Sequence, residues 1–137
     1  MPKLITPLVA VDAVIKYQEN SIVLIGRKNP PFKGELALPG GFVNVGENVE
    51  EACIREAYEE TNINVKLINL IGVFSDPKRD PRGHTISIAF LCEPLTKTEN
   101  PIAKDDAQSV EIVQISEVKS LKLAFDHKDI IIASGIL

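Results

Sequence analysis

The segment from Asn48 to Thr61 constrains the fold of this chain most strongly, because it contains neither Gly nor Pro. Its apolar residues recur at positions i, i+3, i+4 and i+7 from Ile54 onward, which is typical of one face of an α-helix. We therefore predict a helix over this segment, with Ile54, Ala57 and Tyr58 in an apolar stripe that packs on a core.

Three glutamates lie on the same predicted helix. At about 100° per residue, Glu56, Glu59 and Glu60 fall within an arc of roughly 100° beside the apolar stripe. Arg55 can pair with Glu59 at i+4, but one guanidinium cannot neutralise three carboxylates. Such a charge run is often only a solvated helix face. The alternative is a site for a divalent cation, which prefers hard oxygen ligands.

Fixed spacings before the glutamates favour the cation site. Gly41 is followed after five residues by Glu47, and Glu47 is followed after seven residues by Arg55-Glu56. An apolar residue, a spacer and Glu59-Glu60 come next. This order resembles the Nudix box, G-x5-E-x7-R-E-U-x-E-E-x-G-U, in which U is apolar. With residue usage of about 5 to 7% each, the six fixed matches would coincide by chance at roughly 10⁻⁷ per starting position. On residues 41–63 the chain is therefore identified as a member of the Nudix family.

The chain departs from the family pattern where Asn62 replaces the final glycine of the box. In the family that glycine lies just past the helix end, where a left-handed backbone is favoured. Asn is the usual second choice for this conformation, so we expect the helix to end there as usual.

The resemblance implies hydrolysis of a nucleoside diphosphate linked to another group, with Mg²⁺ or Mn²⁺ bound while water attacks a phosphorus of the pyrophosphate. Metal ions suit this chemistry, because they offset the phosphate charge and activate the water. The implied metal ligands are Glu56 and Glu60, with Glu59 and the backbone carbonyl of Gly40 as further ligands, the latter made reachable by a glycine turn.

Other catalytic roles are implied for residues around these ligands. Arg55 would orient the glutamates by ion pairing, and Glu47 would support the loop or Arg55. In this family the general base often comes from an acidic loop residue outside the box, and Asp105 and Asp106 are the candidates here. A simple turn pair is an equal interpretation of these two residues. Glu59, or a metal-bound hydroxide that needs no separate base, is the alternative.

The candidate substrate loop runs from Asp76 to His84 and carries three cations and a histidine between stiffening prolines. A rigid basic loop suits phosphate or ribose recognition, although alone it would be typical of a polar hairpin connection. It resembles the ADP-ribose pyrophosphatase branch, in which a proline lies about fifteen residues beyond the box; Pro77 lies fourteen residues past Ile63. The candidate substrate contacts are Arg79, Arg82 and His84.

The chain has no Trp, so few aromatic residues are candidates for stacking on a base. Phe32, in the loop 29–34, is the first choice and Tyr17 an alternative, while a role for Phe32 in covering the core is equally open. For His127 we expect a surface position, and a position near the substrate cleft is the other interpretation.

The order of predicted elements suggests an α/β or α+β sandwich with a mixed sheet, and the resemblance implies a Nudix-type α/β/α sandwich with a catalytic loop-helix-loop. We expect the apolar run 36–38 to be broken sharply by Pro39-Gly40-Gly41. The predicted strands are 8–17 and 21–25, which form a hairpin, and 65–74, 85–95 and 109–115; a second helix is predicted over 117–132.

Composition limits the remaining possibilities. With 137 residues, 45% of them hydrophobic, the chain fits one compact Nudix hydrolase domain over residues 1–137. No leader or membrane-spanning run is visible, so a cytoplasmic protein without a membrane partner is expected. Cys53 and Cys92 are interpreted as buried structural thiols of a reducing compartment. A net charge of -4 argues against nucleic-acid binding.

The resulting functional hypothesis is a Mg²⁺-dependent ADP-ribose pyrophosphatase that acts on a nucleotide-type small molecule and forms AMP and ribose 5-phosphate. Two alternatives stay open: a sanitising hydrolase of modified nucleoside triphosphates, and a Nudix-like domain that senses ADP-ribose without cleaving it. The intact acids of the box favour catalysis over sensing. Because related ADP-ribose pyrophosphatases are typically homodimers, a homodimer is expected.

Overall fold

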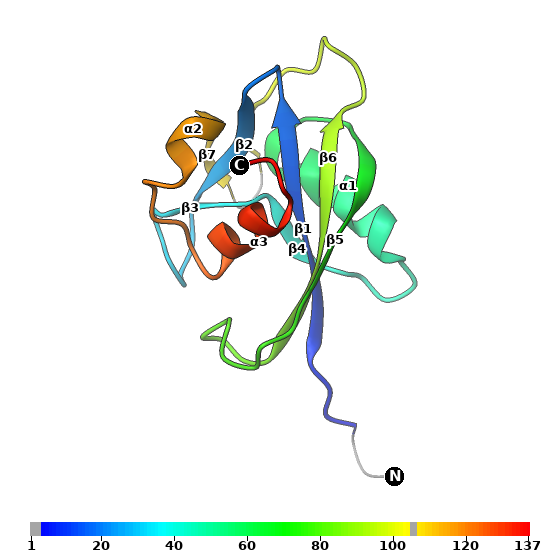
Figure 1. Cartoon of the computed structure of the whole chain (residues 1–137). Coiled ribbons are helices and arrows are strands. Elements are labelled where there is room, and N and C mark those ends of the chain that lie inside the picture. The colour runs from blue at the N-terminus through cyan, green and yellow to red at the C-terminus, as the bar shows by residue number, and fades with distance from the viewer. Residues whose placement is uncertain (1–3, 105–106) are drawn as a thin grey trace.

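The computed structural model describes residues 4–104 and 107–137 and shows a mixed β-sheet with helices on both faces (Figure 1). The strands run in the order β3-β2-β1-β6-β5, while β4 pairs with β1 and β7 pairs with β2. The described elements are β1 (Leu8–Tyr17), β2 (Ser21–Arg27), β3 (Leu36–Ala37), β4 (Gly40–Phe42), α1 (Val49–Thr61), β5 (Val65–Phe74), β6 (Thr85–Pro94), β7 (Ala107–Gln114), α2 (Ile115–Val118) and α3 (His127–Ala133).

Strand β1 organises the sheet, because its two halves have different neighbours. On one side it runs parallel to β6 over residues 8–15. On the other side β4 pairs antiparallel with residues 10–12, and β2 pairs antiparallel with residues 16–17. The predicted hairpin of β1 and β2 is thus confirmed. The change of neighbour along β1 places Gly40 of β4 directly opposite Asp12.

The predicted break at Pro39-Gly40-Gly41 is wrong for the two glycines, which form strand β4 together with Phe42. The chain leaves the sheet only at residues 38–39, and neither glycine has a positive φ. The strand requires glycine for a different reason. A Cβ atom on Gly40 would lie 2.2 Å from the backbone oxygen of Val11, so only glycine lets β4 approach β1 this closely.

The two larger hydrophobic clusters of the described residues lie on opposite faces of the sheet, and a smaller third cluster surrounds Ile25. Successive side chains of a strand point to opposite faces. Val11 and Ala13 of β1 accordingly lie in one buried cluster with Ala57 of α1, whereas Val14 lies in another with Ile130 of α3. Figure 1 shows α3 in front of the sheet and α1 behind it. The predicted α/β/α sandwich with a mixed sheet is confirmed.

Helix α1 begins and ends as its sequence predicts. The Asn48 side chain accepts a hydrogen bond from the backbone N–H of Glu51 at 2.8 Å, which caps the first turn. Asn62 adopts the left-handed conformation with φ 65°, and its backbone N–H donates to the carbonyl oxygen of Tyr58 at 2.9 Å. Asparagine thus takes the place of the family glycine at the helix end.

The buried face of α1 is formed by small residues such as Cys53 and Ala57, which let the helix lie close to the sheet. Ile54 and Tyr58 are 38% and 39% exposed, so their predicted place in the apolar stripe is wrong. The predicted burial of the two thiols is confirmed, since Cys53 and Cys92 are both buried and free, with their Sγ atoms 4.0 Å apart.

The predicted helix over 117–132 is wrong, because only its ends are helical, in α2 and α3. Leu123 bridges to Leu36 of β3, and the backbone N–H of Ala124 donates to the Leu36 oxygen at 2.8 Å. Phe125 then takes a positive φ of 53°, which reorients the chain before α3.

The predicted strands 65–74, 85–95 and 109–115 correspond to β5, β6 and β7 within two residues. None of the described helices is long and apolar enough to cross a membrane.

Candidate active site

Arg55 connects three of the glutamates of the box. Its Nε and Nη2 atoms donate to the two carboxylate oxygens of Glu47 at 2.7 and 2.9 Å. Its Nη1 atom donates to Glu56 at 2.8 Å and to Glu59 at 3.1 Å. The bond with Arg55 is the main reason that the pKa of Glu47 is lowered to about 2. Arg55 and Glu47 therefore form a charged brace beside α1, the positioning role that the resemblance implies for them.

Glu60 lies on the other edge of the glutamate group and is only 4% exposed. Its Oε1 atom accepts the backbone N–H of Gly40 at 3.1 Å, so strand β4 orients this carboxylate from within the fold. A buried carboxylate needs such donors, because burial penalises its charged form. The end of α1 and the start of β4 are thereby joined at one point.

Glu56 lies against Gly41, the first residue of the box. A Cβ atom at Gly41 would lie 2.5 Å from the Glu56 carboxylate carbon, so glycine leaves the space that this side chain occupies. Burial raises the pKa of Glu56 above its ordinary value, although the guanidinium of Arg55 opposes this effect. Glu56 is thus a largely buried carboxylate that is ion-paired with Arg55.

Glu56, Glu60 and Gly40 line one cavity of about 370 Å³, whereas Glu59 does not line it and is bonded to Arg55. Within residues 4–104 and 107–137, no three His, Cys, Asp or Glu side chains are arranged to hold a metal ion by themselves. The two carboxylates and a carbonyl nevertheless fit Mg²⁺, which is usually bound by one or two carboxylates together with substrate phosphates and water.

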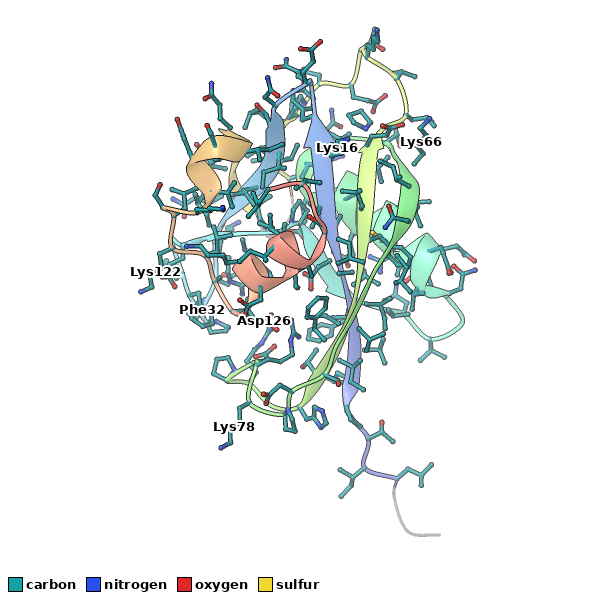
Figure 2. All side chains as sticks on the ribbon, in the orientation of Figure 1. Lys16, Phe32, Lys66, Lys78, Lys122 and Asp126 are labelled. Carbon is teal, nitrogen blue, oxygen red and sulfur yellow. The ribbon has the colours of Figure 1, made fainter. Side chains whose placement is uncertain are left out.

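The loop from Asp76 to His84 contributes two arginines to this cavity. Arg79 is 4% exposed in its side chain, donates from Nε and Nη2 to Asp126 at 2.9 and 2.6 Å, and donates from Nη1 to Ser87 at 3.0 Å. In Figure 2 Asp126 lies at the start of α3, facing the loop, while Lys78 points away from the protein. Arg79 thus anchors the loop to α3.

Arg82 is the more accessible arginine, with 46% of its side chain exposed. It donates to both carboxylate oxygens of Asp80, and its guanidinium lies 5.4 Å from the ring centre of Phe42 and 5.5 Å from that of Phe125. These two rings, which both line the cavity, were not anticipated. Flat, charged and aromatic groups at one cavity wall can bind a base or a phosphate.

Three predicted substrate or base contacts lie elsewhere. Phe32 does not line the cavity but packs edge-to-face on Phe125, with ring centres 4.8 Å apart. His84 is exposed and its Nε2 atom lies 3.1 Å from the Ser75 backbone oxygen, outside the cavity lining. Tyr17 packs against the core on the α1 side of the sheet. Phe32 therefore supports an aromatic wall of the cavity rather than forming it.

Asp12 and His127 are buried cavity residues; the sequence interpretation missed Asp12 and gave a place near the cleft only as its second interpretation of His127. The expected surface position of His127 is wrong, because this side chain is 5% exposed and its Nδ1 atom accepts the backbone N–H of Leu38 at 2.9 Å. Burial lowers the pKa of His127. Its Nε2 atom lies 3.4 Å from Asp12 Oδ1. The sequence did contain a signal for Asp12, because an acidic residue inside the apolar run of β1 is unusual.

Asp105 and Asp106, the candidates for the general base, lie outside the described residues, so that assignment stays a prediction. Lys104, which precedes them, donates its backbone N–H to the Glu60 carbonyl at 3.2 Å, and its Nζ atom lies 4.2 Å from the Tyr58 ring centre. The described chain up to residue 104 therefore runs along the end of α1.

Comparison with known proteins agrees with this geometry. The sequence profile of the NUDIX domain family matches residues 6–133. An ADP-ribose pyrophosphatase of Methanocaldococcus jannaschii is 51% identical over 125 residues, which are 91% of this chain and 71% of that protein. Other matched proteins are longer than this chain. The chain spans 52% of the ADPR responsive transcriptional repressor NtrR of Acinetobacter baylyi and 62% of a MutT/nudix family protein from Enterococcus faecalis.

Two solved structures resemble the fold closely. The NUDIX domain of Shewanella oneidensis NrtR complexed with ADP ribose has a TM-score of 0.86 at 25% identity, covering 96% of this chain and 88% of that one. A bifunctional NMN adenylyltransferase/ADP ribose pyrophosphatase from Francisella tularensis, complexed with AMP and a manganese ion, has a TM-score of 0.82 at 34% identity. That match covers 95% of this chain and 42% of the other.

Proposed function

The chain belongs to the Nudix family, and we propose that it hydrolyses the pyrophosphate bond of ADP-ribose to give AMP and ribose 5-phosphate. The observation that carries the proposal is the convergence of Glu56, Glu60 and the Gly40 backbone in one cavity whose wall also carries Arg82. In such a cavity the two carboxylates can bind a cation, while the guanidinium of Arg82 and the rings beside it can bind the nucleotide. The similarity to an ADP-ribose pyrophosphatase at 51% identity supports the same substrate.

Glu56, Glu60 and the carbonyl oxygen of Gly40 would hold the divalent cation, for which we propose Mg²⁺. When bound, such a cation offsets the charge of the pyrophosphate and activates water. The Francisella tularensis protein, part of which has a similar fold, was solved in complex with a manganese ion, which supports the proposal of a divalent metal. Glu59 is a less direct candidate, because its carboxylate is bonded to Arg55.

The protein residues supply orientation. Arg55, which does not line the cavity, holds Glu56, and the Gly40 N–H holds Glu60, so neither carboxylate has to be ordered when substrate arrives. Preorganisation of this kind reduces the cost of reaching the reactive geometry. For the general base we keep Asp105, Asp106 and Glu59 as candidates, with metal-bound hydroxide as the alternative.

A product assay tests this proposal. ADP-ribose is incubated with the protein in Mg²⁺, and we expect equimolar AMP and ribose 5-phosphate by chromatography. With excess EDTA the rate should fall by at least a hundredfold, because the phosphate charge is then not offset. A panel of oxidised nucleoside triphosphates is assayed in parallel. Turnover of a triphosphate without turnover of ADP-ribose would favour the sanitising hydrolase, and calorimetric binding of ADP-ribose without AMP release would favour the sensor.

We also propose that the protein forms a homodimer through β5, the last strand at one side of the described sheet. Ile68, Leu70 and Val73 of this strand are 44%, 54% and 57% exposed. An edge strand with apolar side chains and unpaired backbone groups favours association. Leu70→Glu should convert a dimer into a monomer in sedimentation velocity, while Ile132→Glu, at an exposed position on α3, should not. A monomeric wild-type protein would contradict the proposal.

A further inference from the structure

The side of the cavity that faces α3 contains a carboxylate to which no function has been assigned. Asp12 is 6% exposed, lines the cavity, and lies opposite Gly40 in the β1–β4 pairing. Among the buried side-chain oxygen and nitrogen atoms of the described residues, its Oδ2 atom alone has no hydrogen-bond partner. A buried carboxylate oxygen without a donor is costly, and a functional role is one explanation for keeping it.

The donors around Asp12 are directed elsewhere. His127 accepts the Leu38 N–H through Nδ1, which leaves the proton on Nε2, and that atom lies 3.4 Å from Oδ1 rather than Oδ2. The Nε, Nη1 and Nη2 atoms of Arg79 donate to Asp126 and Ser87. The Gly40 N–H donates to Glu60. Oδ2 therefore keeps an unused acceptor position, which a ligand in the cavity can fill once the Asp12 carboxylate turns toward it.

Asp12 belongs to a different part of the cavity from the glutamates. A Cβ atom built on Gly40 would lie 2.6 Å from Asp12 Oδ1. A Cβ atom built on the next strand residue, Gly41, would lie 2.5 Å from the Glu56 carboxylate. Because successive strand residues point to opposite faces, the two carboxylates lie on opposite sides of β4. The absence of a three-carboxylate metal group in the described residues agrees with this separation. Asp12 is thus adjacent to the proposed cation site without belonging to it.

We propose that Asp12 binds a ribose hydroxyl of the substrate, with Oδ2 as the acceptor, in a subsite completed by His127. The proposal rests on the proposed function, since ADP-ribose carries a ribose on each side of its pyrophosphate. A phosphate is excluded as the partner of Oδ2, because two anions would repel there. A hydroxyl is a compact neutral donor, and a hydrogen bond to a charged carboxylate is among the stronger ones in proteins.

Calorimetry without Mg²⁺ measures the subsite independently of turnover. Three ligands are compared: ADP-ribose, its analogue with 2′,3′-dideoxyadenosine, and ADP esterified to a simple alkyl alcohol in place of the terminal ribose. Asp12→Ala should weaken ADP-ribose binding about 10- to 100-fold. The same substitution should have little effect on the analogue that lacks the bound hydroxyl, and this analogue identifies which ribose Asp12 contacts.

Two further variants keep the test decisive. Asp12→Asn retains the shape and an acceptor oxygen, so it should bind ADP-ribose more tightly than Asp12→Ala if the hydroxyl is accepted here. Asp129→Ala removes an exposed carboxylate of α3 outside the cavity lining and should bind all three ligands like the wild type. Equal weakening of all three ligands by Asp12→Ala would show a merely structural role and overturn the proposal, and so would wild-type binding that does not distinguish the ligands.

The outcomes separate this subsite from the proposed function. A wild-type protein that releases AMP from ADP-ribose while Asp12→Ala leaves the ligand preference unchanged would refute the subsite alone. A wild-type protein that discriminates the analogues through Asp12 but releases no AMP in Mg²⁺ would refute the hydrolase alone. A wild-type protein that does not bind ADP-ribose would refute both.

Discussion

Replacing Glu60 by glutamine is expected to lower kcat for ADP-ribose about a thousandfold, equivalent to about 4 kcal/mol of transition-state stabilisation. Glu60 is a proposed metal ligand, and glutamine removes the charge while keeping the shape. The amide oxygen can still accept the Gly40 N–H that the carboxylate now accepts at 3.1 Å. Loss of the charge also relieves repulsion from neighbouring carboxylates, so the free energy of unfolding should change by no more than about 1 kcal/mol.

Steady-state kinetics in saturating Mg²⁺ and urea denaturation of the same preparation check this expectation. Glu50→Gln is the matched control, because Glu50 is an exposed glutamate in the first turn of the same helix and does not line the cavity. Its kcat should stay within about twofold of the wild type, as is usual for surface substitutions. Unchanged turnover in Glu60→Gln would remove the metal role of this residue.

Gly41→Ala is expected to lower kcat/KM at least about a hundredfold while the protein stays folded, a loss of about 2.7 kcal/mol. The new Cβ would lie 2.5 Å from the Glu56 carboxylate carbon, so the carboxylate has to move. The clash is with the flexible end of a side chain, which can turn away without disturbing the backbone. The displaced Glu56 would no longer lie where Arg55 orients it. Activity measurements and a thermal melt of the variant test both parts of this prediction.

Two other glycines provide contrasting controls. A Cβ at Gly40 would lie 2.2 Å from the backbone oxygen of Val11, so Gly40→Ala should disrupt the pairing of β4 with β1 and lower Tm markedly. A Cβ at Gly72 would meet only ordinary contacts at 3.8 Å or more, so Gly72→Ala should leave activity near that of the wild type. An active Gly41→Ala variant would mean that the position of Glu56 is not critical.

Local sequence signals predicted the elements whose structure depends on near neighbours. Helix α1 has a capping Asn48 at its start and Asn62 at its end, and both bond within a few residues along the chain. Strands β5 and β6 were equally predictable, because long runs of β-branched and aliphatic residues are bounded by turns. The brace of Arg55 with Glu47 spans eight residues, but fixed spacing within the Nudix box made it predictable by resemblance.

Signals failed where distant segments decide the conformation. The second predicted helix is interrupted because Leu123 and Ala124 bond to Leu36, a residue far away in the sequence. No Gly or Pro marks that interruption, so local propensity gave no warning. His127 was expected at the surface, but it bonds to the backbone of Leu38, 89 residues away. The aromatic cavity residues Phe42 and Phe125 were missed for the same reason.

The sequence alone determined the family, the metal-type carboxylates and the helix that carries them, because spacing along one helix places side chains regardless of the rest of the fold. Only the tertiary structure decided which of these carboxylates line the cavity. It directed Glu59 to Arg55 and Glu60 to the Gly40 N–H. It also buried Asp12 beside His127, a contact between β1 and α3 that the sequence of neither segment specifies. The physical reason is that cavity walls and the burial of polar groups arise from contacts between segments remote in sequence, which periodicity and propensity do not encode.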